Sequence, residues 1–217
     1  NAKKVINDII AKGSVEYGWL GVNSGNPSRE LRESLNIKTT SGAFVFDVFL
    51  GSPADKAGIQ PGDLIVRVGN TEVKDSNDLV RLVGNLNPGT VTQLQVIRFG
   101  ETLTVSVRME ARQPETELDK LARRAWPGFS AVELTQQIRR NLNLSADAGR
   151  LIIGNVTSGS SAESAGLRTG DIIREINGKR INSVADFYRA INVNQKEFMI
   201  RINRSGNEFL IGLVRER

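Results

Sequence analysis

The sequence has 217 residues and a formal net charge of +5, with 39% hydrophobic and 24% charged residues, which is typical of a globular chain longer than one small domain. It contains no cysteine and no histidine, so disulfides, thiolate metal sites and any Ser-His-Asp or Cys-His mechanism confined to this chain are excluded. No apolar run approaches the roughly 20 residues that span a bilayer.

Residues 3–12 place Val5, Ile6, Ile9 and Ile10 on one stripe at helical spacing, which predicts a short helix. Such a helix buries little by itself, so we expect it to dock on another surface. The chain opens on Asn-Ala-Lys-Lys, without an initiator Met or a secretory signal. We therefore expect a fragment or a processed form, with residues 1–16 as a linker helix at the tail of an upstream domain.

The strongest signal is an internal repeat. Residues 51–83 align without gaps with residues 159–191, with 10 identities in 33 positions. An offset of 108 residues is the size of a domain, so two copies of one fold are predicted.

Each copy opens on a short helix and a turn. Ser52 is a predicted N-cap, Pro53 suits the first helical position, and Gly58 can end the helix in a left-handed conformation. Gly62 and Asp63 then form a turn in which the Asp bonds to local backbone N–H groups. We expect these residues, and Gly166, Gly170 and Asp171 in the second copy, to be structural.

Strands and a longer helix follow in each copy. Alternating apolar residues predict strands at 64–68, 93–98 and 102–108, and at 172–176, 198–203 and 208–214. Amphipathic helices are predicted at 77–86 and 184–192. The predicted fold is α+β and mostly β, with two partly open β-barrels that each carry one short and one longer helix. We expect domains at 17–112 and 127–217, joined by a linker at 113–126.

The repeat resembles bacterial PDZ domains. The resemblance rests on Gly51-Ser52-Pro53-Ala54 through Pro61-Gly62-Asp63-Leu64-Ile65, and on Gly18-Trp19-Leu20-Gly21-Val22, which is similar to their carboxylate-binding loop. A helix followed by a Gly-aromatic-Leu-Gly-Val segment is similar to the C-terminal region of the HtrA/Deg family of envelope serine proteases. The resemblance implies a periplasmic or cell-envelope location, a trimer-based homo-oligomer and a catalytic triad outside this sequence.

The resemblance also implies a peptide site in the first domain. The N–H groups of Leu20, Gly21 and Val22 would bind a peptide carboxylate, while the peptide adds as a strand. The groove would be lined by Trp19, Leu79, Leu82, Val83 and Leu86, although Leu82 and Leu86 fit a purely core role equally well.

The second domain is expected to bind peptide less readily. Its possible groove consists of Phe129, Ser130, Ala131, Phe187 and Ile191, with Ser130 predicted at the place of the loop glycine. A purely structural role for these residues is at least an equal alternative, and a docking or scaffold role is a further one.

No catalytic residue, metal or cofactor is predicted, because the chain has neither a phosphate-loop motif nor clustered oxygen ligands. Its basic clusters are interleaved with acidic residues, which argues against nucleic acid. The expected partners are peptides or unfolded proteins with apolar C-termini. The predicted function is non-catalytic substrate capture for an HtrA-like protease in protein quality control. The alternatives are an assembly scaffold, or the PDZ pair of an intramembrane protease or secretion-system component.

Overall fold

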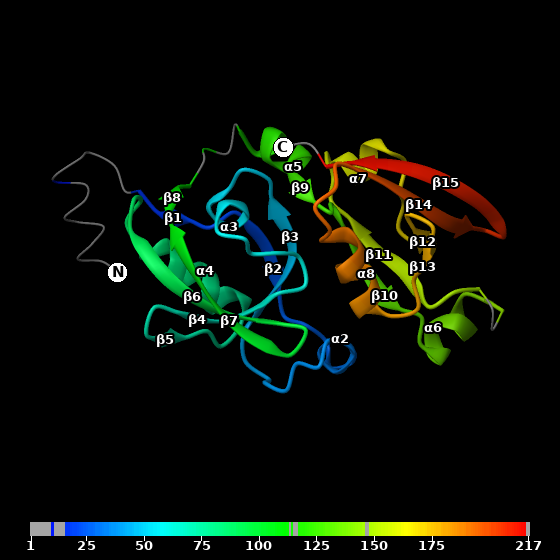
Figure 1. The fold of residues 1–217 in the computed structure, drawn as a ribbon, viewed down its shortest axis with the longest axis horizontal. Coiled ribbons are helices and arrows are strands. Elements are labelled where there is room, and N and C mark those ends of the chain that lie inside the picture. The colour runs from blue at the N-terminus through cyan, green and yellow to red at the C-terminus, as the bar shows by residue number, and fades with distance from the viewer. Residues whose placement is uncertain (1–9, 11–15, 113, 115–116, 146–147, 216–217) are drawn as a thin grey trace.

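The computed structural model describes residues 10, 16–112, 114, 117–145 and 148–215. Each copy of the repeat forms its own antiparallel sheet with short helices against it, and the two lie side by side (Figure 1). This confirms the predicted α+β, mostly β fold. The helix predicted at 3–12 lies, apart from Ile10, outside the described residues. Among the described helices, none combines the length and the apolar character needed to cross a membrane.

The first domain is built on a sheet with the strand order β2-β3-β4-β6-β7, in which β5 pairs with β4. A separate small pair joins β1 to β8. The strands are β1 (Gly18–Trp19), β2 (Val22–Gly25), β3 (Ala43–Phe49), β4 (Leu64–Val68), β5 (Thr71–Glu72), β6 (Val91–Arg98), β7 (Glu101–Arg108) and β8 (Glu110–Ala111). The helices are α2 (Arg29–Ser34), α3 (Pro53–Lys56) and α4 (Ser76–Gly84).

The second domain repeats this plan with the strand order β10-β11-β12-β14-β15, in which β13 pairs with β12. The strands are β10 (Phe129–Glu133), β11 (Leu151–Val156), β12 (Ile172–Ile176), β13 (Lys179–Arg180), β14 (Glu197–Arg204) and β15 (Asn207–Val214). Strand β9 (Ala125–Trp126) precedes them and belongs to the first domain's sheet. The helices are α5 (Leu118–Arg123), α6 (Gln136–Asn141), α7 (Ser161–Ser164) and α8 (Val184–Ile191).

The repeated motif folds as its residue types predict. The Ser52 hydroxyl accepts a hydrogen bond from the Asp55 N–H, and Pro53 opens helix α3. The Asp63 carboxylate accepts one from the Gln60 N–H at 2.9 Å, which closes the turn at Gly62. Burial raises the pKa of Asp63, whereas the hydrogen bonds and the charge of Arg98 act to lower it.

Two short helices were not predicted. Helices α2 and α6 lie at equivalent places in the two domains, after the first long strand, and neither contains a fully buried residue. Each starts at a capping hydroxyl, Ser28 or Thr135, that accepts a hydrogen bond from a backbone N–H three residues later. The missing apolar stripe explains why the hydrophobic pattern did not reveal them.

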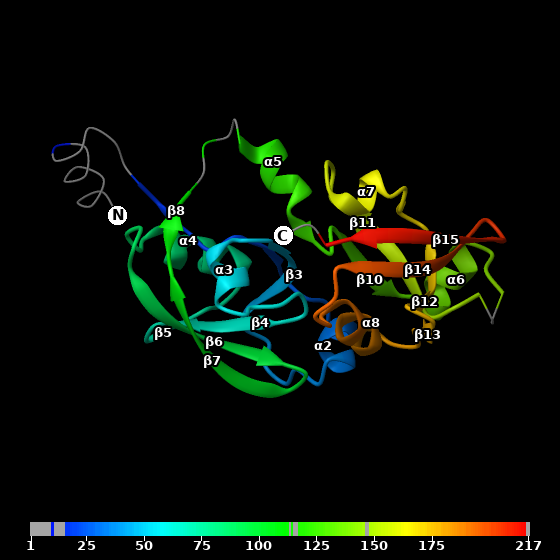
Figure 2. The same cartoon turned by 45° about the horizontal axis from the view of Figure 1, so that its top comes forward.

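The two domains share a hydrophobic core. Leu35, Phe44 and Leu64 of the first domain belong to the same buried cluster as Trp126 and Phe187. Strand β9, which falls in the predicted linker, adds to the first domain's sheet by pairing with β3. Helix α2 lies beside helix α8 in both views of the ribbon (Figures 1 and 2). The second domain is therefore packed directly onto β3 and α2 of the first.

Candidate functional site

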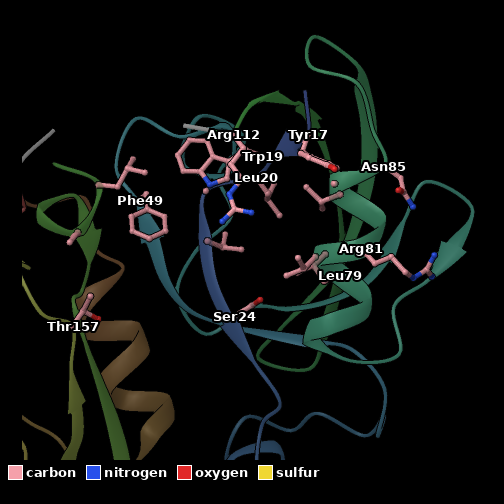
Figure 3. A pocket seen from close by; sticks show the side chains of 18 residues that line it. Tyr17, Trp19, Leu20, Ser24, Phe49, Leu79, Arg81, Asn85, Arg112 and Thr157 are labelled. Atoms are coloured by element: carbon pink, nitrogen blue, oxygen red, sulfur yellow. The ribbon is translucent and has the colours of Figure 1, made fainter. Parts of the chain in front are cut away.

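A cavity of about 600 Å³ lies between β2 and α4 of the first domain (Figure 3). Strand β2 is the edge strand of its sheet, so its outer side is available for pairing. The predicted site residues that line this cavity are Trp19, Leu20, Gly21, Val22, Leu79 and Val83. The structure thus brings the loop and helix α4 together around one apolar hollow.

The loop before β2 depends on Gly21. This residue has φ +83°, which L side chains rarely adopt. The Gly21 carbonyl accepts a hydrogen bond from the Ser52 hydroxyl at 3.2 Å, and an added Cβ would lie 2.2 Å from the Ser52 Cβ. A side chain at this position would therefore collide with the cap of helix α3.

Helix α4 presents only part of its predicted apolar face to the cavity. Leu79 and Val83 line it and are buried. Leu82 and Leu86 do not line it, and both are partly buried against the first domain's core. Their partial burial fits the core role that we kept open for these two leucines, and their place in the peptide groove stays a prediction.

The cavity is also lined by residues that the sequence analysis did not predict, among them Phe49, Arg112 and Tyr17. Phe49 at the end of β3 packs its ring 6.1 Å from that of Trp19. Arg112, directly after β8, turns its side chain into the cavity, and Tyr17 lies opposite (Figure 3). The Arg112 N–H bonds to the Tyr17 carbonyl, which fixes both residues beside the loop. The pairing of β1 with β8 brings Arg112 close to the loop, so no local sequence pattern could have indicated that Arg112 lines the cavity.

The second domain also has a loop glycine, but not where we predicted it. Gly128 has φ +77°, and its carbonyl accepts a hydrogen bond from the Ser160 hydroxyl at 3.3 Å. These are the features of Gly21 with Ser52 in the first domain. Gly128, not Ser130, therefore corresponds to Gly21, and the predicted alignment of this loop was displaced by two residues.

The residues predicted for the second groove come together, but they are covered. Phe129 and Phe187 pack edge to face with ring centroids 5.4 Å apart. Phe44 of the first domain packs edge to face on Tyr188, at 5.6 Å. Burial raises the pKa of Tyr188 far above its usual range. The predicted groove residues are Phe129, Ala131, Phe187 and Ile191, all buried, and Ser130, half-buried.

The described residues hold no group of three or more acidic side chains arranged to bind a metal ion. The cavity is lined by the backbone of the loop, by apolar side chains and by two arginines, Arg81 and Arg112, and it lies at a sheet edge. Such an arrangement suits a ligand with an anionic end, an extended backbone and an apolar side chain.

Comparison with known proteins identifies the fold. One family model described as a PDZ domain matches residues 19–109, and a second matches residues 152–204. The chain belongs to the PDZ family, with two PDZ domains in tandem. The cavity described above thus lies in the first PDZ domain, and the covered residues belong to the second.

Curated relatives confirm the resemblance to the HtrA/Deg C-terminal region. The probable periplasmic serine endoprotease DegP-like of Hahella chejuensis is 33% identical over 221 residues, covering 98% of this chain and 46% of the relative. That of Pseudomonas fulva is 34% identical, covering 86% of this chain and 40% of the relative. The chain spans less than half the length of these relatives.

Solved structures give partial matches. An HtrA-type protease AlgW with tripeptide is 32% identical with a TM-score of 0.48, covering 53% of this chain and 38% of that chain. The serine endoprotease from Yersinia pestis is 25% identical with a TM-score of 0.41, covering 52% of this chain and 35% of that chain.

Proposed function

We propose that the first PDZ domain captures the C-terminus of a substrate protein by strand addition to β2. The observation that carries this proposal is the conjunction of a free sheet edge, a glycine loop and an apolar cavity at one place. The peptide carboxylate would accept hydrogen bonds from the N–H groups of Leu20, Gly21 and Val22. Its last side chain would enter the hollow formed by Leu79 and Val83.

Arg112 would add electrostatic attraction to this capture. Its side chain points into the cavity beside the loop, so it can approach the carboxylate that the backbone N–H groups hold. A guanidinium suits a carboxylate because it offers several donors in one plane. Burial of the apolar side chain contributes about 1.5–3 kcal/mol, while micromolar binding needs about 8 kcal/mol. Backbone pairing and the carboxylate contacts must therefore supply the larger part of the binding free energy.

At the level of the whole protein, we propose that the chain is the substrate-recognition part of an HtrA-like serine protease of the bacterial periplasm. The proposal is supported by the relatives, which are named periplasmic endoproteases and are about twice as long as the matched region. The catalytic residues would then lie outside this sequence, and the substrates would be misfolded envelope proteins. The proposed domain limits are 17–112 and 127–217, with possible subunit contacts in a homo-oligomer.

Calorimetric titration with a short apolar-ended peptide tests this proposal. The free acid is expected to bind the chain at micromolar concentration, and the C-terminal amide at least about tenfold more weakly, because a lost charge-assisted hydrogen bond costs about 1.5–3 kcal/mol. In Arg112→Ala, affinity for the acid should fall about tenfold while affinity for the amide changes little. The preference for the acid over the amide should therefore shrink.

Arg180→Ala is the matched control, since Arg180 is an exposed arginine on β13, outside the cavity. It removes the same charge and should leave both affinities unchanged. Equal binding of acid and amide by the unmodified chain would show that the first domain does not recognise a C-terminus. An equal loss of affinity in the Arg112 and Arg180 variants would show that Arg112 acts only through the net charge of the chain and not through contact with the carboxylate.

A further inference from the structure

The second PDZ domain holds a carboxylate at its loop, and that carboxylate belongs to the first domain. Asp47 on β3 is 2% exposed, and its Oδ1 accepts a hydrogen bond from the Gly128 N–H at 2.9 Å. Its Oδ2 accepts from the Thr157 hydroxyl at 3.2 Å and from the Asn23 side-chain amide at 3.1 Å. Burial raises the pKa of Asp47, while these three donors act to lower it.

Gly128 is the counterpart of Gly21, so Asp47 lies where the proposed first-domain site would hold the end of a peptide. The correspondence rests on matching geometry, since each glycine has a positive φ and accepts a hydrogen bond from an N-cap serine, Ser52 or Ser160. The two loops differ in one respect. The second domain has Pro127 at the position of Leu20, and proline has no backbone N–H to donate.

Strand β3 also has the direction that a ligand needs. A peptide that ends at the loop must run antiparallel to β10, because β10 begins at the loop. Strand β3 runs antiparallel to β9, which leads into the loop: Phe49 pairs with Ala125, Val48 pairs with Trp126, and Asp47 then bonds to Gly128. Strand β3 also contacts β10. Further back along β3, Phe44 packs on Tyr188 of helix α8.

Other contacts close the remaining groove. The Ser34 hydroxyl at the end of α2 donates a hydrogen bond to the Glu133 carboxylate at the end of β10. The Asn192 side-chain amide, directly after α8, donates to the Pro61 carbonyl of the first domain at 2.8 Å. The first domain thus covers the edge strand and the helix that together form a PDZ groove.

We propose that strand β3 is an internal ligand of the second PDZ domain, with the Asp47 side chain in the place of a peptide's terminal carboxylate. The intact chain then offers one open peptide site, in the first domain, and a second site that opens only when the domains separate. The occupant of the second groove is a segment of this same chain, which competes with any external C-terminus. The inference goes beyond the proposed function, and it rests on that function for the place of a terminal carboxylate and for the choice of the probe peptide.

Gly62 provides a way to open the interface. It has φ +95°, and an added Cβ would lie 2.8 Å from Cγ of Tyr188 across the interface. Gly170, its counterpart in the second domain, has φ +94° with nothing within 4 Å of an added Cβ. Gly62→Ala and Gly170→Ala therefore impose the same backbone strain in the same kind of turn, and only the first disturbs the contact between domains.

The test is a titration of the full isotope-labelled chain with the apolar-ended free-acid peptide, followed at the amide signals of Gly21 and Gly128. In the unmodified chain and in Gly170→Ala, the Gly21 signal should move with saturation and the Gly128 signal should stay. In Gly62→Ala, both signals should move. Asp47→Asn, with Glu72→Gln as an exposed charge-matched control, provides a second opening variant if Gly62→Ala does not fold.

Saturable movement of Gly128 in the unmodified chain would overturn the inference, because the second groove would then be open. An unmoved Gly128 in folded Gly62→Ala and folded Asp47→Asn would also overturn it, because the uncovered groove would not be a peptide site. The Gly21 amide signal tests the proposed function independently of the Gly128 signal. If Gly21 never moves while Gly128 moves only in the opened variants, the proposed capture by the first domain fails and the internal ligand stands.

Discussion

Gly21→Ala is expected to lower the affinity of the chain for a free-acid peptide by at least about 100-fold, which corresponds to about 2.7 kcal/mol. The new Cβ would lie 2.2 Å from Cβ and 2.6 Å from Oγ of Ser52, so the loop and the cap of helix α3 must move apart. The backbone N–H groups of Leu20, Gly21 and Val22, which we propose as the carboxylate donors, would then be displaced. Calorimetric titration measures the loss.

Gly58→Ala is the matched control for this substitution. Gly58 has φ +80°, close to the +83° of Gly21, but an added Cβ there meets nothing within 4 Å. Both variants should lose about 1–2 kcal/mol of stability from the left-handed backbone, and only Gly21→Ala should lose peptide affinity. Normal binding by Gly21→Ala, or an equal loss in Gly58→Ala, would contradict the proposed role of the loop.

Arg98→Ala is expected to lower the free energy of unfolding of the first domain by about 3 kcal/mol. The Arg98 guanidinium bonds to both carboxylate oxygens of Asp63, at 2.7 and 2.8 Å, and to the Gly58 carbonyl at 2.8 Å. The Asp63 side chain is fully buried, so the substitution leaves a buried carboxylate without its counter-charge. Urea unfolding measures the effect.

Arg204→Ala should act similarly on the second domain, because Arg204 forms the same bidentate pair with Asp171 and bonds to the Gly166 carbonyl. Arg29→Ala is the exposed control. Its ion pair with Glu33 is open to solvent, and the unfolding midpoint should hardly change. A midpoint for Arg98→Ala close to that of Arg29→Ala would show that Asp63 is held well enough by the turn alone.

Much of the fold was predictable because its signals are local. The caps at Ser52 and Ser160, the turns at Gly62 and Gly170, and the two amphipathic helices each depend on residues within a few positions of one another. The repetition of the motif in one chain also made a second domain evident without any knowledge of the structure. The PDZ models confirm that interpretation.

What the sequence did not reveal depends on distant pairing. Arg112 reaches the cavity because β8 pairs with β1, more than ninety positions away along the chain. Asp47 accepts a hydrogen bond from Gly128, which lies 81 positions further along the chain. The residue pattern around Asp47 gave no indication of this contact. Ser130 was aligned with the loop glycine because Pro127 makes the second loop differ in sequence from the first. The positive φ that identifies Gly128 is visible only in the folded chain.

The two domains share the same local features around these sites and differ in what lies next to them. Both have an edge strand, a longer helix and a loop glycine next to a serine cap. The first groove faces a cavity, while the second faces β3 and α2 of its neighbour. Thr157 takes part in both places, since it lines the cavity and donates a hydrogen bond to Asp47.

The central claim is that the first domain holds the last residue of a peptide in the cavity between β2 and α4. The most direct test is to record nuclear Overhauser contacts between the methyl groups of the peptide's terminal side chain and the methyl groups of the labelled chain at saturation. The account predicts contacts to Leu20, Leu79 and Val83 and to no residue of α8. Saturable binding with contacts elsewhere, or with none to these three residues, would contradict it.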